Sequence, residues 1–237
     1  MMKGFFSSCI LLRLIFAILM CTVAIFPLKA QDRLSWFAEG SVLFFPEANG
    51  NLSDPMPILP SLGAGLGLPI FNHFRLEISL DMYFAIYGYD DGLNRAVPMA
   101  WENRSAFVWG SVLGAQGVYF HDFYPGFLEG RAMTLRVFGG LAADLRIVLL
   151  APDLKPAVNP NLAEIKQEVS AVAKYFWSKG RWLLPVFGSG LDFELNTKFR
   201  LGLDLRVWFP LYKLWTNENL PGIEGWRFGI GARITFL

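Results

Sequence analysis

Charged side chains at every second position are the residues of this chain whose types and spacing could support chemistry. Between residues 74 and 86, Arg75, Glu77 and Asp81 alternate with large apolar residues. Successive side chains of a β-strand point to opposite faces, so these charges share one face and the apolar residues share the other. Opposite charges on one enclosed face can pair as ions and hydrogen-bond one another.

The same alternation recurs along the chain and predicts a network of ion pairs. Acids and bases balance in number, and every base is Arg, whose planar guanidinium can satisfy several acceptors at once. Glycines on the same face, such as Gly63 and Gly190, leave space for these long side chains. The expected network comprises Glu39, Arg75, Glu77, Asp81, Arg136, Asp144, Arg146, Asp192, Glu194, Arg200, Asp204, Arg206, Arg227 and Arg233.

Residues for catalysis or metal binding are few. The two histidines, His73 and His121, fall in predicted turns, where neither meets the partner that a Ser–His arrangement needs. Both cysteines, Cys9 and Cys21, precede residue 31, and no cluster has the spacing of metal ligands. We therefore expect no catalytic residues, no metal site, no cofactor and no enzyme activity.

Eight alternating segments are predicted to be the β-strands that position the charges. The segment 74–86 exceeds the roughly five or six residues of a typical globular strand, and it suits the roughly nine to eleven that cross a bilayer at a tilt. The eight segments are residues 34–45, 62–71, 74–86, 105–120, 133–149, 183–195, 199–209 and 226–236.

The connections between these segments alternate in length, which predicts an all-β, eight-stranded, antiparallel, up-and-down transmembrane β-barrel. Residues 46–60, 90–103, 151–181 and 211–225 form long outer loops, whereas 72–73 and 196–198 form short periplasmic turns and 121–130 is intermediate. An interior of eight strands is only wide enough for side chains to fill it. The charged face is therefore expected to close the lumen.

The third outer loop contains an apolar stripe with two interpretations. Asn159 and Pro160 could begin a helix whose spacing places Ile165, Val172 and Phe176 on one side. Residues 165–177 also alternate, which would suit a strand. We prefer a short helix at 161–177, because an added strand makes the strand count odd.

Aromatic residues near the strand ends predict girdles at both membrane interfaces. A soluble barrel of lipocalin type is the alternative, because alternation alone does not separate inside from outside. The outer girdle is assigned to Tyr87, Tyr89, Trp101, Trp182, Trp208 and Trp226, and the inner one to Phe71, Phe74, Tyr119, Phe199 and Phe236.

Residues 1–30 are predicted to be a signal peptide, and residues 31–237 the outer-membrane barrel domain. Lys3 precedes an apolar run, and Ala30 ends a plausible cleavage site. An uncleaved anchor helix and lipidation at Cys21 are the alternatives. The net charge of +1 gives no reason to expect a nucleic-acid partner.

The stretches 185–193, 196–201 and 229–237 combine a Gly-rich strand, a short polar turn and a closing amphipathic strand. In these features the chain resembles small outer-membrane β-barrels, most closely the OmpW group, and it is also similar to OmpA/OmpX-type barrels. The resemblance makes Phe228, Ile230, Ile234 and Phe236 the signal read by the barrel-assembly machinery, although Leu237 follows the aromatic residue that usually ends the chain.

The OmpW resemblance implies a passive, porin-like role as a narrow conduit for small or hydrophobic molecules in the cell outer membrane, reached through the periplasm. The alternative is a closed structural barrel whose surface-exposed loops act as an adhesin or partner-binding scaffold. The expected partners are outer-membrane lipid, the barrel-assembly machinery, and either small hydrophobic solutes or host and surface ligands. Soluble ligand binding is a third class.

Overall fold

The structure is a computed structural model that describes residues 34–46, 58–92, 94–99, 106–125, 131–150, 162–216 and 225–236. The chain divides into two compact units, Met1–Arg33 and Leu34–Leu237. The predicted signal peptide, Trp101 and Leu237 lie outside the described residues. Among the described helices, none has the length and apolar character needed to span a membrane.

The second unit consists mainly of long antiparallel strands. Most strands are longer than those of ordinary globular sheets, as the extended alternation in the sequence predicts. The strands are β1 (Ser35–Phe44), β2 (Ile58–Phe71), β3 (Phe74–Asp90), β4 (Arg95–Pro98), β5 (Ala106–Phe123), β6 (Met133–Leu150), β7 (Leu183–Asn196), β8 (Phe199–Trp208) and β9 (Arg227–Phe236).

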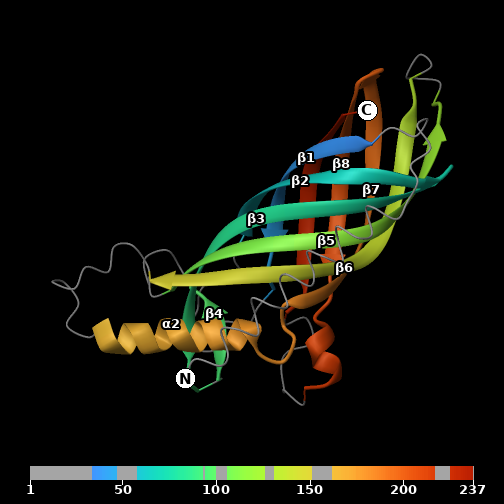
Figure 1. Cartoon of the computed structure of the whole chain (residues 1–237). Helices are drawn as coiled ribbons and strands as arrows, with labels where there is room; N and C mark the ends of the chain where they lie inside the picture. Colours follow the sequence, from blue (N-terminus) through green and yellow to red (C-terminus); the bar gives the residue numbers. More distant parts are fainter. Residues whose placement is uncertain are drawn as a thin grey trace. The chain divides into compact units, whose positions relative to one another are not determined.

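Eight of these strands close into a ring, which confirms the predicted up-and-down β-barrel. Each strand pairs with its neighbour in the order β1-β2-β3-β5-β6-β7-β8-β9, and β9 pairs with β1 from Trp36↔Phe236 to Phe44↔Phe228. Closure pairs the two edges that an open sheet would leave exposed. Figure 1 shows the ring with β4 and α2 at one end, here called the helix end. The turn end is the opposite one, with the tight turns at Asn72–His73 and Thr197–Lys198.

The predicted helix in the third long connection is confirmed as α2 (Leu162–Trp177), and the alternative strand is wrong. Its inward stripe buries Val172 and Phe176 against the extended ends of the sheet. Glu164 in the first turn and Lys174 in the last turn complement the helix dipole. A short 3₁₀ helix, η2 (Leu211–Leu214), lies in the fourth connection.

The strand β4 is an addition that the sequence did not predict, since it falls in the expected loop 90–103. It pairs with β3 from Tyr87↔Pro98 to Asp90↔Arg95, beyond the point where the β2–β3 pairing ends at Ser61↔Tyr83. Two other boundaries also differ. The strand β2 begins at Ile58 inside the expected loop 46–60, and β5 continues to Phe123, so His121 lies in a strand rather than in a turn.

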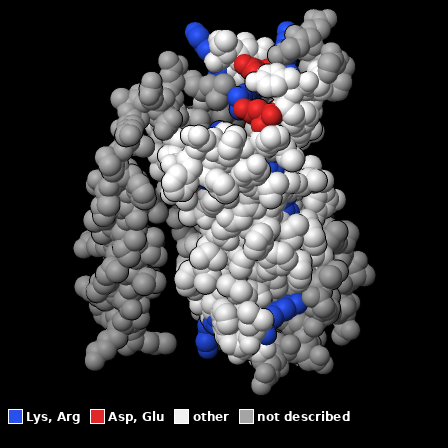
Figure 2. Space-filling model, turned by 90° about the vertical axis from the view of Figure 1, so that its right-hand side faces the viewer, with Lys and Arg blue, Asp and Glu red and all other residues white. Residues whose placement is uncertain are grey.

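The two faces of the barrel wall have opposite polarity. Outward positions carry exposed apolar side chains, such as Leu203 (59% exposed) and Leu205 (56%). The alternating positions Asp204 (1%) and Arg206 (5%) are buried inside. On the face shown in Figure 2, uncharged residues cover the middle, and most charged groups lie toward the two ends.

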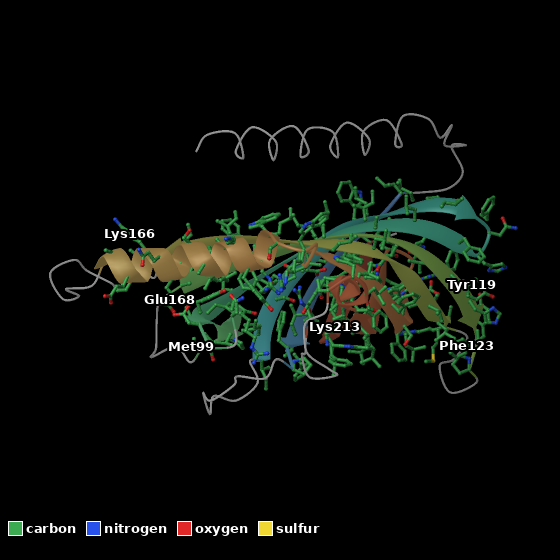
Figure 3. The ribbon with its side chains drawn as sticks, turned by 90° about the horizontal axis from the view of Figure 1, so that it is seen from below. Met99, Tyr119, Phe123, Lys166, Glu168 and Lys213 are labelled. Carbon is green, nitrogen blue, oxygen red and sulfur yellow. The ribbon has the colours of Figure 1, made fainter. Side chains whose placement is uncertain are left out.

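The residues assigned to the two aromatic girdles lie on the outer face at the turn end, whereas two of those at the helix end do not. Phe71, Phe74, Tyr119 and Phe236 are exposed near the turns, and Phe199 is half-buried against Phe236. Tyr119 and Phe123 mark this end in Figure 3, far from Lys166 and Glu168 on α2.

At the helix end, Tyr87 and Trp208 are buried in the interior rather than displayed outside. Both residues fall on the alternate positions of their strands that point inward, so the prediction that they belong to an outer girdle is wrong. Tyr89, Trp182 and Trp226 are half-buried. The aromatic residues most exposed at the outward positions of this end include Phe84 and Phe187 instead.

Candidate functional site: the charged barrel interior

The inward face of the barrel holds a dense set of buried ionic groups. The alternation of each strand aims them at the axis, and the tilt of the strands brings residues from distant parts of the chain together. Arg136, Glu77 and Arg233 are each almost completely buried. Burial of an unpaired charge costs several kcal/mol, so each of these groups requires an opposite charge or strong hydrogen bonds.

Arg206 of β8 bridges the lumen. Its guanidinium donates to Glu39 on β1 and, at 3.2 Å, to Asp81 Oδ2 on β3. Strands β3 and β8 are four places apart in either direction around the ring, so they face each other across the barrel. The ion pair between Arg206 and Asp81 therefore crosses the full width of the interior.

Arg136 of β6 joins the same network from a third side. Its Nη2 donates to Asp192 Oδ1 at 2.9 Å, and it also pairs with Asp204. Asp204 in turn lies 3.2 Å from Arg206 Nη2. One carboxylate is thus shared by two guanidinium groups, an arrangement that suits the several fixed donors of Arg.

Arg233 of β9 and Glu77 of β3 form a bidentate pair. The two guanidinium nitrogens Nη1 and Nη2 donate to the two carboxylate oxygens at 2.8 and 2.7 Å. Arg233 Nε donates to Thr235 Oγ1 at 3.1 Å, and the guanidinium lies 3.6 Å from the ring centre of Phe37. Parallel hydrogen bonds of this kind are the strongest form of charged pairing.

A second cluster surrounds Asp144 nearer the helix end. Arg146 Nε and Arg227 Nη2 each lie 2.6 Å from Asp144 Oδ2, and Tyr83 donates its hydroxyl to Oδ1 at 3.0 Å. The Arg146 guanidinium stacks 4.1 Å from the ring centre of Phe176 on α2. This contact ties the helix to the charged interior.

The remaining predicted network residues lie toward the turn end and are less tightly held. Arg75 is 4.0 Å from Glu77 and donates to Ser35 Oγ at 3.3 Å. Arg200 donates to Thr134 Oγ1 at 3.1 Å and lies 3.8 Å from Asp122. Glu194 is half-buried and takes no part in the ion pairs formed among the described residues.

Glycine makes room for this packing at two inward positions. A Cβ at Gly63 would collide with the Asp81 carboxylate, and one at Gly190 would lie 2.7 Å from Arg136 Nη2. The close approach of these side chains to the wall therefore depends on the missing Cβ.

The interior also contains apolar and neutral residues that the expected network omitted. Tyr83, Thr134 and Gln116 hydrogen-bond its charged members. Phe45, Val108 and Leu184 fill the helix end together with Trp208. Their inward parity was readable in the sequence, where Val108 and Val112 interrupt the polar face of the strand near 105–120.

Every acid of the predicted network except Glu194 is paired with an Arg. The described residues contain no group of three or more acids, histidines or cysteines suited to a metal ion. His73 and His121 are exposed at the turn end. His73 lies beside the rings of Tyr119 and Phe120.

The residues predicted to carry the assembly signal lie on one face of β9. Phe228, Ile230, Ile234 and Phe236 all point outward and are exposed. Phe236 packs edge-on against Phe199 of β8, with ring centres 5.4 Å apart. The last described strand therefore presents a continuous apolar row beside its neighbour.

No family model matches this sequence, and no curated protein does. Among solved structures, the chain is similar to Neisserial surface protein A (TM-score 0.45, 11% identity, 86% of this chain and 96% of that chain). It is also similar to the N-terminal β-barrel domain of Pseudomonas aeruginosa OprF (TM-score 0.41, 13% identity, 85% and 96%). A third is Ail, the attachment invasion locus protein of Yersinia pestis (TM-score 0.40, 7% identity, 86% and 95%).

Proposed function

We propose that this chain is an integral outer-membrane β-barrel that spans the bilayer with its eight closed strands. The inverted polarity of the wall carries the proposal: the outward positions are apolar and exposed, and the inward ones are ionic and buried. A soluble barrel requires the opposite. In hydrocarbon, a closed barrel satisfies every backbone hydrogen-bonding group within the wall, so this surface is compatible with lipid.

The barrel is proposed to be closed and to serve as a scaffold for the structure at its helix end. Ion pairs cross the lumen from β8 to β3 and from β9 to β3, and side chains fill the space between. The strands β3, β5 and β6 continue beyond the β2–β3 and β6–β7 pairings and, with β4, form a platform that α2 covers. The surface that this platform and α2 form together is the one proposed to bind a host or surface ligand.

Photolabelling tests the membrane assignment. The protein is purified in detergent from cells that express the full chain and is returned to lipid vesicles. A lipid-soluble photoprobe should mark Leu203 and Leu205 and spare Arg206, and gel migration should shift on boiling. Labelling of the interior rather than the apolar face would overturn the proposal.

Surface labelling tests the orientation. A membrane-impermeant amine reagent applied to intact cells should modify Lys166 and Lys174, which are exposed on α2 at the helix end. Lys198, exposed in the turn between β7 and β8, is the matched control and should react only after the outer membrane is opened. The reverse pattern would place the platform in the periplasm.

A second candidate is the OmpW-like conduit for small hydrophobic molecules. It is favoured by the apolar interior at the helix end, where Phe45, Leu184 and Trp208 lie beyond the ionic network. Recording in planar bilayers separates the two candidates. The closed scaffold predicts no single-channel steps, and clear steps of reproducible size would favour the conduit.

The proposed partners follow from the same surfaces. Outer-membrane lipid would cover the apolar wall, and the barrel-assembly machinery would read the outward row of β9 that ends at Phe236. Replacement of Phe236 by Ser should lower the amount of folded barrel in the membrane while leaving synthesis unchanged. Replacement of the inward Thr235 by Ser is the control.

A further inference from the structure

The outer wall carries two rows of aromatic side chains, one near the turn end and one near the helix end. Four strands contribute one residue to each row, and on all four the two residues are ten positions apart. The even separation places both residues on the same face of the strand. The pairs are Phe74 and Phe84 on β3, Tyr119 and Trp109 on β5, Phe199 and Phe209 at the two ends of β8, and Phe236 and Trp226 at the two ends of β9.

Contacts between neighbouring strands hold each row together. In the turn-end row, ring centres lie 5.2 Å apart for the residues of β3 and β5 and 5.4 Å apart for those of β8 and β9. In the helix-end row, the corresponding distances are 6.0 and 4.5 Å. The strands β3 and β5 lie four places away from β8 and β9 in the ring of eight. Each row therefore has one cluster on either side of the barrel, and the two rows define two parallel levels.

The separation of the rows matches the thickness of a hydrocarbon layer. Ten residues span about 33 Å along a strand, at roughly 3.3 Å each. A strand tilt of roughly 40° shortens this to about 25 Å, which is the height of the apolar band on outer-membrane barrels. The exposed large side chains between the rows on these strands are apolar, as at Leu80, Leu203 and Ile230.

We infer that the two headgroup layers of the bilayer cross the barrel at these rows, so that hydrocarbon covers the wall only between them. Aromatic rings prefer this level because they combine a large apolar surface with, in Trp and Tyr, a group that hydrogen-bonds to water. The partner of both rows is lipid, so the inference rests on the proposed function. The polarity of the wall alone determines neither the depth nor the orientation of the barrel in the bilayer, whereas the rows determine both.

The platform then lies outside the hydrocarbon. Strand β3 continues from the helix-end row at Phe84 to Asp90, where β4 pairs with it. On β6, Ile147 pairs with Trp109 of the same row, and the strand continues to Leu150. The helix α2 packs against β3 and β6. A soluble partner can therefore reach the platform and α2 without entering the bilayer.

Spin labels on β6 test this depth, because no outward position of that strand is aromatic and a label there leaves both rows intact. Leu141 (54% exposed) lies between the residues of β6 that pair with Tyr119 and Trp109. Leu149 (46% exposed) lies beyond the second of them, on the platform. The variants Leu141→Cys and Leu149→Cys are made in the full chain with both natural cysteines replaced by Ser, and the products are folded into phosphatidylcholine vesicles.

Accessibility of the label to oxygen, which dissolves preferentially in hydrocarbon, is compared with its accessibility to a water-soluble nickel chelate. The ratio of the two should be at least tenfold higher at Leu141 than at Leu149. Equal, high ratios at both sites would overturn the inferred depth and leave the membrane assignment intact. A low ratio at Leu141 would refute the inference together with the proposed function.

The turn-end row is tested in the same way. Tyr124 is 70% exposed and lies five positions past Tyr119, so the label on Tyr124→Cys should be as open to the chelate as the label at Leu149. Boiling-dependent gel migration of each variant establishes that the barrel is folded before the comparison. If the Tyr124 label lies in hydrocarbon, the rows do not mark the two boundaries and the inference is wrong.

Discussion

At the scale of single residues, the bidentate pair of Glu77 and Arg233 is the contact whose loss should lower the stability of the barrel most clearly. Both side chains are completely buried. Glu77→Gln should destabilise the barrel by about 3–5 kcal/mol, because it removes the bidentate partner of the buried Arg233 and leaves only the longer contact with Asp204 at 3.9 Å. The midpoint of denaturant unfolding in detergent measures the loss. Asp122→Asn is the matched control, since its pair with Arg200 is partly exposed and should contribute less than about 1 kcal/mol.

The same pair allows a double-variant test. Glu77→Leu combined with Arg233→Met removes both charges, and an apolar pair of similar volume is often as stable as the buried ion pair that it replaces. The double variant should recover most of the stability lost in Glu77→Gln. If the two changes were simply additive, the two side chains would not be coupled.

The sequence predicted which residues point inward but not which of them pair. Parity along each strand identified Arg206, Glu39 and Asp81 as interior residues. Which of them meet depends on the shift in register between neighbouring strands. This shift accumulates over eight tilted strands and cannot be read from the sequence of any single strand. Tyr87 and Trp208 lie inside because they share the inward parity of their strands, although aromatic residues near strand ends suggest a girdle.

At the scale of elements, α2 is held by a few contacts with the platform. Phe176 packs edge-on against Tyr87 with ring centres 4.9 Å apart, and Glu168 accepts a hydrogen bond from the backbone N–H of Tyr89 at 3.0 Å. Phe176→Ala should remove about 3–5 kcal/mol of packing and release the helix locally. Trypsin should then cut after Lys174 at least tenfold faster.

The barrel itself should survive this change. Boiling-dependent migration should be unaltered in Phe176→Ala, and Ser170→Ala, on the exposed side of the helix, should leave the rate of trypsin cleavage unchanged. Equal cleavage in both variants would show that Phe176 does not hold the helix in place.

The sequence predicts α2 but not β4, because only α2 contains a repeated apolar spacing. The spacing of Ile165, Val169, Val172 and Phe176 repeats over about three turns, which gives α2 a clear period. The four residues Arg95–Pro98 contain no repeat and end in a proline. Their strand exists because β3 extends past β2 and leaves an unpaired edge.

At the scale of the whole molecule, the proposed lipid contact makes the outward face intolerant of charge. Leu205→Arg should cost about 2–4 kcal/mol and reduce folding into vesicles, because it places an ion in hydrocarbon. Leu214→Arg is the control, since Leu214 lies on η2 outside the strands. Folding yield, read from boiling-dependent migration, provides the comparison. A barrel with its apolar face in water would instead gain solubility from Leu205→Arg.

The architecture of the whole barrel followed from local signals. Strand number, antiparallel order and closure were readable from alternation and from the lengths of the connections. The filling of the lumen at the helix end could not be predicted in this way. Phe45 follows β1, and Val108 and Leu184 lie on β5 and β7, so these residues meet only in the closed ring.

The ion pairs across the lumen set an order of events during biogenesis. Arg206 and Glu39 are 167 residues apart, and Arg233 and Glu77 are 156 residues apart, so neither pair can form until the last strands have met the first. Until then these arginines must remain hydrated. Under the membrane assignment proposed above, the growing wall therefore has to keep these arginines in contact with water while its outer face meets lipid, and the ion pairs form only at final closure.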